Sequence, residues 1–361
     1  MNTVQSGKAG IGPARRRALI RVMVVDDSIT VRSAVCRTID PEPDIVTVAT
    51  AGSAEVALEI LEGQPVDVIV LDLEMPGIGG LAALPKLLET APEAQVLVVS
   101  SLTARGAEAT VQALAMGAAD TLEKPRSGQF DDAYRSRFLA QLRALGEQAP
   151  LAPEAPPVPQ AKTTKSARVE ALALGASTGG IHALSTLLRA MPSTVAVPIF
   201  VTQHLPSSFM TVFAGQLSAA SGREAVIAQD GMAVQSGRIH IAPGDGNIVV
   251  EGSRDAPVIH LTHERSASHC LPSLDPMFAS LAGVYGEALL AVVLTGMGRD
   301  GLTGARDVAA TGGTVLAQSA ESCAVYGMPR GVVEAGLVRQ SLPPAELGHA
   351  IGKLCGVPAW T

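Results

Sequence analysis

Residues 22–27 read VMVVDD, and a similar stretch at 67–72 reads DVIVLD. Each is a short aliphatic run that ends in an acidic residue, a pattern typical of buried parallel strands. Further runs of this kind lie at 44–50, 96–101 and 120–125. Helix-like stretches separate the runs, such as 53–62, where Ser53 is a suitable N-cap. Strands that alternate with helices predict a parallel, doubly wound sheet in the first part of the chain.

The second part of the chain repeats this alternation of strand-like and helix-like stretches. Strands are predicted at 169–177, 195–204, 237–243 and 288–296. The region 237–261 combines short strand-like runs with a Gly-Asp-Gly turn at 244–246, which predicts a hairpin at one edge of this sheet. We therefore expect a second α/β domain with the same layered architecture as the first.

A stretch of different composition separates these two parts. Residues 145–165 read LGEQAPLAPEAPPVPQAKTTK, which is rich in Pro and Ala and offers little to bury. Such a sequence favours an extended, semi-rigid linker. The predicted organisation is a disordered N-terminal extension at 1–19, a first domain at 20–144, a linker at 145–167 and a second domain at 168–357.

Composition and charge narrow the classes of function. The 361 residues suit two domains, and hydrophobic residues make up 47% of them, while aromatic residues make up only 3%, so the cores must be aliphatic. A formal net charge of -7 argues against nucleic-acid binding, and we interpret the basic run at 15–17 as part of a frayed terminus. Apolar runs such as 288–294 are shorter than the roughly 18 residues of a membrane span. The four scattered cysteines predict reduced thiols in a cytoplasmic protein without membrane insertion.

Acidic residues gather where the predicted strands of the first domain end. Asp26 and Asp27 follow the first strand and Asp72 ends the third, and carboxyl ends of parallel strands meet at one edge of a sheet. Clustered carboxylates repel one another, and Mg²⁺ relieves that repulsion by accepting their oxygens. Ser100 and Lys124 end the fourth and fifth strands, where a hydroxyl and an ammonium can contact a phosphoryl group. The pattern favours phosphoryl transfer to an Asp over a set of simple helix caps.

The motifs VDDS, LDLEMP, VSS and KP, in this order, resemble the receiver domain of response regulators. The resemblance implies that Asp72 is the phosphoacceptor and that it holds Mg²⁺ together with Asp26 and Asp27. It also implies that Ser100 and Lys124 sense the phosphoryl group. The chain departs from the family after LDLEMP, because Gly79 stands where an acidic residue is usual, and we expect a looser loop there.

A second group of reactive side chains falls at the predicted strand ends of the second domain. Ser177 lies in GASTGG at 175–180, a strand-to-helix turn that alone is equally compatible with phosphate binding or a plain turn. His204 ends the next strand, and Asp300 follows another strand in LTGMGRDG at 294–301. Together they predict a triad with Ser177 as nucleophile, His204 as general base and acid, and Asp300 as the group that orients the imidazole. The backbone N–H of Met297 is the leading candidate for an oxyanion hole.

The motifs GASTGG, TQHLP, APGD, PSLDPMF, LTGMGRDG and AQSAESCAVYGMP occur in the order found in chemotaxis protein-glutamate methylesterases, and the second domain resembles this CheB family. The resemblance places the family triad on Ser177, His204 and Asp300, with Thr178 and Met297 near the nucleophile and the oxyanion. It implies two doubly wound domains, the first flavodoxin-like and the second Rossmann-like. Leu271 stands where the family commonly has Arg before PSLD, and we expect an effect on substrate affinity or turnover.

The family resemblance also implies an activity, partners and a mode of control. The expected reaction is hydrolysis of glutamate γ-methyl esters on methyl-accepting chemotaxis receptors, with deamidation of receptor glutamines as a second activity and no cofactor for ester hydrolysis. A chemotaxis histidine kinase is the expected phosphodonor, and the unphosphorylated receiver is expected to cover the catalytic site. The rival hypothesis is a phosphorylation-gated binding module with a catalytically weak second domain, which methanol release from methylated receptors would distinguish.

Overall fold

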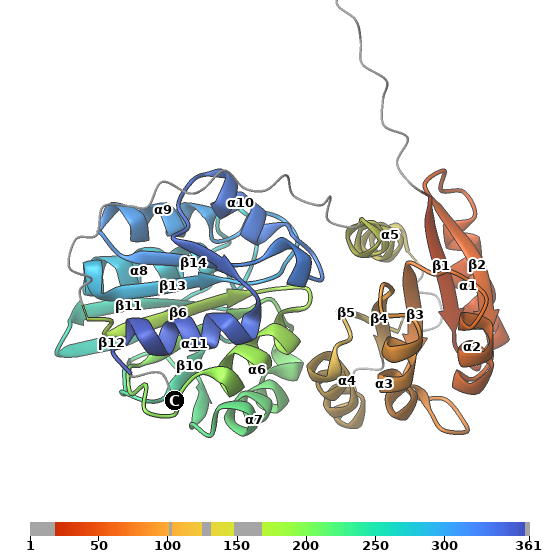
Figure 1. The fold of residues 1–361 in the computed structure, drawn as a ribbon, viewed down its shortest axis with the longest axis horizontal. Helices are drawn as coiled ribbons and strands as arrows, with labels where there is room; N and C mark the ends of the chain where they lie inside the picture. The colour runs from red at the N-terminus through yellow and green to blue at the C-terminus, as the bar shows by residue number, and fades with distance from the viewer. Residues whose placement is uncertain (1–18, 101–102, 125–130, 148–167, 358–361) are drawn as a thin grey trace, which may run out of the picture.

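The computed structural model describes residues 19–100, 103–124, 131–147 and 168–357 (Figure 1). The predictions for the N-terminal extension at 1–18 and for the linker at 148–167 lie outside the described residues. In the part that the structure describes, no helix is long and apolar enough to cross a membrane.

The first domain is a five-stranded parallel sheet with helices on both sides. Its strands are β1 (Ile20–Val25), β2 (Ile45–Ala51), β3 (Val68–Asp72), β4 (Gln95–Ser100) and β5 (Asp120–Glu123). Its helices are α1 (Ile29–Ile39), α2 (Ala54–Leu61), α3 (Gly80–Thr90), α4 (Ala104–Met116) and α5 (Asp132–Gly146). The strand order β2-β1-β3-β4-β5 is the flavodoxin-like order, which confirms the predicted fold class.

Local sequence signals account for these elements. All five residues of β3 are buried, as expected for a central strand of a parallel sheet. Ser53 caps α2 by accepting a hydrogen bond from the Val56 N–H at 3.4 Å, as its sequence position predicts. Helix α5 continues two residues past the predicted end of the domain, because Leu145 is buried in the apolar core and Gly146 lies close against Ile20.

The second domain contains a seven-stranded parallel sheet in the order β15-β14-β13-β6-β7-β10-β8 (Figure 1). The strands are β6 (Ala171–Ala176), β7 (Ile199–Gln203), β8 (Ala225–Ile227), β10 (Ile239–Ile241), β13 (Leu289–Val293), β14 (Thr314–Gln318) and β15 (Gln340–Leu342). The α-helices are α6 (Gly180–Ala190), α7 (Met210–Ser221), α8 (Leu274–Tyr285), α9 (Leu302–Ala310), α10 (Met328–Glu334) and α11 (Pro344–Leu354). The 3-10 turns are η1 (Ser207–Phe209), η2 (Gly286–Ala288) and η3 (Ala320–Ser322). Strands β7, β10 and β8 lie on one side of β6, and β13, β14 and β15 lie on the other side. The boundary between β6 and β13 is therefore a topological switch point.

The predicted hairpin exists, but its placement at an edge of the main sheet was wrong. It is formed by β11 (Asn247–Ser253) and β12 (Ala256–Thr262), which join β9 (Met232–Ala233) in a separate three-stranded antiparallel sheet. The turn of the hairpin lies after residue 253, and the Gly-Asp-Gly stretch at 244–246 precedes β11. Strand β10 is fully buried and pairs with β7 and β8 inside the main sheet, since its apolar run suits burial on both faces.

Helix α4 of the first domain packs against α6 and α7 of the second. Val111 and Leu114 of α4 share one buried apolar cluster with Met210 and Phe213 of α7. Removal of these side chains from water stabilises the contact between the two domains. The first domain therefore lies against the face of the second domain from which α6 and α7 begin.

Candidate active site

Adjacent parallel strands bring Ser177 and His204 together. The last residues of β6 and β7, Ala176 and Gln203, are register partners, and the His204 N–H donates to the Ala176 carbonyl at 3.1 Å. Ser177 and His204 are the next residues on the two strands, so their backbones lie side by side. On the other side of β6, the Ser177 N–H donates to the Thr295 carbonyl at 3.0 Å, just beyond the end of β13. The three strand ends therefore converge on the nucleophile position.

Asp300 holds the His204 ring through a hydrogen bond of 2.8 Å between His204 Nε2 and Asp300 Oδ2. Its Oδ1 atom accepts hydrogen bonds from the hydroxyls of Ser273 at 2.6 Å and Ser268 at 2.8 Å. Oδ2 also accepts the Leu274 N–H at 2.8 Å. Burial alone would raise the pKa of Asp300, but these hydrogen bonds, with that of His204 the strongest, hold the pKa below its ordinary value. Asp300 is therefore a buried, ionised and fixed carboxylate.

The His204 imidazole is mostly buried and has two anionic or polarisable neighbours. Burial acts to lower its pKa, but the hydrogen bond to Asp300 and an interaction with the Cys270 thiol outweigh that effect and raise the pKa to about 9. Cys270 is half-buried in the loop that precedes α8. The ring thus lies between a carboxylate and a thiol, of which the thiol was not anticipated from the sequence.

Small residues make room for the Ser177 turn. A Cβ atom on Gly296 would lie 2.7 Å from the Ser177 Cβ, so only glycine allows the loop after β13 to approach the serine this closely. Gly179 has a positive φ of 77°, where glycine is favoured, and α6 begins at the next residue. Gln203 fixes the turn by donating from Nε2 to the Ser177 carbonyl at 2.8 Å. Within the described residues, no hydrogen bond joins the Ser177 hydroxyl to His204.

Met297 and Thr178 flank the nucleophile in different ways. Met297 follows Gly296 directly, is 39% exposed as a residue, and lines a crevice shared with Ile20 and Arg143 of the first domain. Thr178 is buried, and its hydroxyl donates to Asp120 Oδ2 of β5 at 2.6 Å. The Gly179 N–H donates to the Ala119 carbonyl at 2.5 Å. The first domain therefore contacts the residues that directly follow Ser177.

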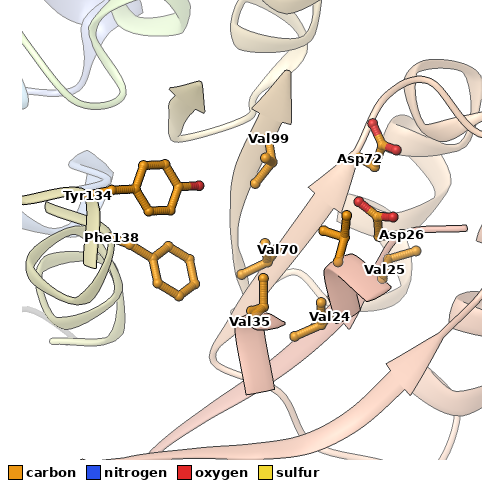
Figure 2. A pocket seen from close by; sticks show the side chains of 10 residues that line it. Val24, Val25, Asp26, Val35, Val70, Asp72, Val99, Tyr134 and Phe138 are labelled. Carbon is orange, nitrogen blue, oxygen red and sulfur yellow. The ribbon is translucent and has the colours of Figure 1, made fainter. Parts of the chain in front are cut away.

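The predicted acidic site forms at the carboxyl ends of β1 and β3. Carboxylate oxygens of Asp26, Asp27 and Asp72 lie within 4.8 Å of one another. Lys124 Nζ lies 2.5 Å from Asp72 Oδ2 and 3.4 Å from Asp26 Oδ2. Figure 2 shows the Asp26 and Asp72 carboxylates close to each other, with strand valines such as Val24 and Val70 below them and to their left. This all-oxygen donor set fits a hard divalent cation such as Mg²⁺.

The charge balance at Asp72 shows why a cation suits this site. Burial raises the pKa of Asp72, Lys124 opposes that rise, and the neighbouring charge of Asp26 adds to it. The net effect is a pKa of Asp72 above its ordinary value, so the neighbouring protein groups do not fully balance the negative charge of this carboxylate. Gly80 is required beside it, because a Cβ there would lie 2.0 Å from the Asp72 carbonyl oxygen. The close approach of α3 to Asp72 thus involves Gly80, the usual glycine of the family pattern, and not the departure at Gly79.

Ser100 is buried, and its hydroxyl lies 2.6 Å from that of Thr110 on α4. The two residues predicted to sense a phosphoryl group therefore differ in their surroundings, since Lys124 contacts Asp72 while Ser100 contacts α4. Helix α4 is the same helix that packs on α6 and α7. Ser100 thus contacts the helix that packs against the second domain.

Sequence reasoning missed several residues that shape the catalytic site. Ser273 lies in the PSLD motif and both caps α8 and donates to Asp300, but the sequence gives no sign of the second role. Gln203 lies in TQHLP, where strand periodicity marks it only as a strand residue. The fold places Cys270 next to His204 and Asp120 next to Thr178. No local sequence pattern predicts either pair.

Two family models and several curated relatives match this chain. The family model described as CheB methylesterase matches residues 172–351, and that described as response regulator receiver domain matches residues 22–132. The protein-glutamate methylesterase/protein-glutamine glutaminase 1 of Paramagnetospirillum magneticum is 41% identical and aligns over 93% of this chain and 96% of its own. The corresponding protein of Azospirillum brasilense is 38% identical over 96% of this chain and 94% of its own. The crystal structure of the Thermotoga maritima CheB methylesterase catalytic domain is 33% identical and covers 53% of this chain and 99% of its own, with a TM-score of 0.49.

These findings define a response regulator in which a receiver domain precedes an α/β effector domain. The chain belongs to the CheB family of protein-glutamate methylesterases/protein-glutamine glutaminases.

Proposed function

We propose that this chain is a phosphorylation-activated protein-glutamate methylesterase that hydrolyses glutamate γ-methyl esters on chemoreceptors and releases methanol. The observation that carries the proposal is the convergence of Ser177, His204 and Asp300 at neighbouring strand ends in a chain of the CheB family. The relatives named above are enzymes, which disfavours the rival hypothesis of a catalytically weak binding module. A chemotaxis histidine kinase is the proposed phosphodonor.

The chemistry follows from the positions of the three side chains. Ser177 attacks the ester carbonyl carbon, and its hydroxyl proton passes to the neutral form of the His204 ring, which later returns a proton to the leaving methoxide. Asp300 keeps the ring oriented and stabilises its positive charge through the 2.8 Å hydrogen bond. The backbone N–H of Met297, on the loop next to Ser177, is proposed to stabilise the oxyanion. Water then hydrolyses the acyl-enzyme by the same route.

Deamidation of receptor glutamines is proposed as a second activity of the same site. An amide and a methyl ester both react through a tetrahedral oxyanion, and they differ mainly in the leaving group that His204 must protonate. The test is mass spectrometry of receptor peptides after incubation with the protein. Loss of glutamate methyl esters supports the esterase activity, and conversion of glutamine to glutamate supports the deamidase activity. Methyl esters that stay unchanged would contradict the first activity, and glutamines that stay unchanged would contradict the second.

The receiver site is proposed to take up phosphate on Asp72. Asp26, Asp27 and Asp72 would hold Mg²⁺, which when bound neutralises charge on the entering phosphoryl group. Lys124 already contacts Asp72 and is positioned to pair with a phosphoryl oxygen. Ser100 is proposed to turn from Thr110 toward the phosphoryl group, which would change the contacts of α4.

Phosphate labelling tests this assignment. We expect Mg²⁺-dependent labelling of the full chain by a small phosphodonor, and we expect Asp72→Asn to abolish it, because the acceptor carboxylate is gone. Glu74→Gln removes an exposed carboxylate two residues away and should label normally. Equal labelling of wild type and Asp72→Asn would refute the assignment of Asp72. Labelling that survives Asp26→Asn combined with Asp27→Asn would refute their metal role.

The receiver is proposed to cover the catalytic site until it is phosphorylated. Three observations support this: the Thr178–Asp120 and Gly179–Ala119 hydrogen bonds, and the packing of α4 on α6 and α7. Strand β5 begins at Asp120, which contacts Thr178, and ends at Glu123, which directly precedes Lys124 at the acidic site. This four-residue strand therefore links Thr178 to the acidic site over about 13 Å. Phosphorylation must favour the uncovered state to activate the enzyme.

Removal of the receiver should mimic activation. A fragment that begins near Lys165 should hydrolyse methyl esters roughly 5–150-fold faster than the unphosphorylated full chain, the range given by a coupling of about 1–3 kcal/mol. The linker keeps the receiver at a high effective concentration, so a modest interface suffices to block the site. Initial rates at matched concentrations measure the effect. Equal rates for the fragment and the unphosphorylated chain would show that the receiver is not a cover.

Asp120 should make the covered state sensitive to pH. Burial raises the pKa of Asp120 and outweighs the hydrogen bond from Thr178 and the nearby charge of His204. When the domains separate, the carboxyl regains an ordinary pKa, so the covered state gains stability as pH falls and loses it as pH rises through the raised pKa. The rate of the unphosphorylated full chain, divided by that of the fragment, should therefore fall as the pH is lowered through the raised pKa of Asp120.

Two substitutions on β5 make this pH test specific. The Asp120→Asn variant has no carboxyl group at this position to ionise, so its rate ratio should not depend on pH. Glu123→Gln removes an exposed carboxylate at the other end of the strand and should keep the pH dependence of the wild type. An unchanged pH dependence in Asp120→Asn would assign the effect to another group.

A further inference from the structure

The Cys270 thiol completes a cluster of three metal-ligating groups at the catalytic histidine. A ring nitrogen of His204, the Cys270 sulfur and a carboxylate oxygen of Asp300 all lie within 4.8 Å of one another. They come from three separate segments: the end of β7, the loop before α8 and the loop after β13. His204 and Cys270 are both partly exposed, so an ion from solvent can reach the cluster. The proposed hydrolytic mechanism uses His204 and Asp300 but gives Cys270 no role.

The donor set differs in kind from that of the receiver. Nitrogen, sulfur and oxygen donors together suit Zn²⁺, which accepts Cys, His and carboxylate ligands and completes four-coordination with water. The receiver cluster of Asp26, Asp27 and Asp72 offers oxygen alone and suits Mg²⁺. A thiolate ligand discriminates strongly between these two ions, because Mg²⁺ is hard and Zn²⁺ is softer.

The surroundings of Asp300 resemble the outer support of a built metal site. Ser268 and Ser273 both donate to Oδ1, which leaves Oδ2 facing His204. Such hydrogen bonds fix the orientation of a ligating carboxylate. The loop that carries Cys270 is also constrained, since the Arg265 guanidinium donates to the His269 carbonyl at 2.8 Å and His269 has a positive φ of 62°. The thiol is therefore held beside the ring by a defined backbone.

We propose that His204, Cys270 and Asp300 form an inhibitory Zn²⁺ site that competes with catalysis. Ligands about 2.0–2.1 Å from a tetrahedral Zn²⁺ lie about 3.3 Å apart, whereas His204 Nε2 and Asp300 Oδ2 are 2.8 Å apart, so a side-chain movement of about 0.5 Å admits the ion. Binding releases the thiol proton of Cys270 and any proton shared between His204 and Asp300 to solvent. With the ring coordinated to Zn²⁺, His204 cannot accept the Ser177 proton, so hydrolysis stops.

The inhibition depends on the proposed function, but binding of the ion does not, and binding is measured first. Co²⁺ occupies zinc sites and gives an intense near-ultraviolet absorption when a thiolate is a ligand. The reduced full chain should show this absorption with Co²⁺ and lose it when Zn²⁺ is added. Cys270→Ser should abolish it, and Cys36→Ser, which changes a half-buried thiol of α1 in the receiver, should keep it. Ser177→Ala, which removes no ligand, should also keep it.

Activity provides the second readout of the site. Outer hydrogen-bonding partners contribute about 10–100-fold to metal affinity, so loss of a direct ligand should raise the Zn²⁺ concentration for half-inhibition by about 100-fold or more in Cys270→Ser. Each variant's inhibition is expressed relative to its own rate without metal. If Cys270→Ser folds poorly, the same measurement is made with Cys270→Ala. Absence of the thiolate absorption in wild type would overturn the proposal, as would equal Zn²⁺ inhibition of wild type, Cys270→Ser and Cys270→Ala. If wild type and all variants lacked esterase activity but wild type still showed the Co²⁺–thiolate absorption, only the proposed function would be contradicted.

Discussion

Replacing Ser177 with alanine should lower ester hydrolysis by on the order of 10⁶-fold, because loss of a triad nucleophile leaves only binding and oxyanion stabilisation. The residue sits where β6 turns into α6, with the His204 backbone beside it and the Gly296 loop against its Cβ. The substitution removes one hydroxyl and no described hydrogen bond of that side chain, so the fold should be unaffected. Methanol release from methylated receptor membranes measures the effect.

A matched serine makes the Ser177 result interpretable. Ser207→Ala removes an exposed hydroxyl three residues after His204 and should leave the rate nearly unchanged. Circular dichroism checks that both variants are folded. Near-normal methanol release by a folded Ser177→Ala protein would falsify the assignment of the nucleophile.

Replacing Asp300 with asparagine should lower turnover by about 10⁴-fold, the cost of a comparable change in another Ser-His-Asp triad. An Asn amide can present a donor to His204 Nε2 in place of the carboxylate oxygen, which favours the wrong tautomer of the ring. It would also remove the negative charge that the Ser273 and Ser268 hydroxyls and the Leu274 N–H now stabilise.

The Asp300 variant requires a control for stability, because it alters a buried hydrogen-bond network. Asp307→Asn changes an exposed carboxylate on the following helix and should have little effect on rate or on thermal unfolding. If folded Asp300→Asn retained most of the wild-type activity, Asp300 would have a structural role at the start of α8 and no role in catalysis.

The strands and the positions of the site residues along them were predictable from local pattern. Short aliphatic runs that end in Asp, Ser or His identify strand ends, and parallel topology brings such ends to one edge. That reasoning sufficed for Asp26 and Asp72 in the first domain and for Ser177 and His204 in the second. It works because burial on both faces of a parallel sheet imposes a continuous apolar pattern on each strand.

Contacts made between distant segments were not predictable in this way. Strand β10 and the β11–β12 hairpin are close in sequence but belong to different sheets, a choice decided by burial against the rest of the domain. Cys270 reaches His204 only through the loop before α8, and Asp120 reaches Thr178 only when the two domains pack. A single sequence carries no periodicity that encodes such pairings.

Control of ester hydrolysis by the receiver is tested by the initial rate of methanol release from methylated chemoreceptor membranes, measured with and without a small phosphodonor and Mg²⁺. We expect a low rate for the unphosphorylated chain, a rate about 5–150-fold higher after phosphodonor treatment, and no activation in Asp72→Asn. Ser177→Ala should release almost no methanol under either condition. A rate that does not respond to the phosphodonor, or that persists in Ser177→Ala, would contradict the claim that phosphorylation of the receiver controls a serine esterase in this protein.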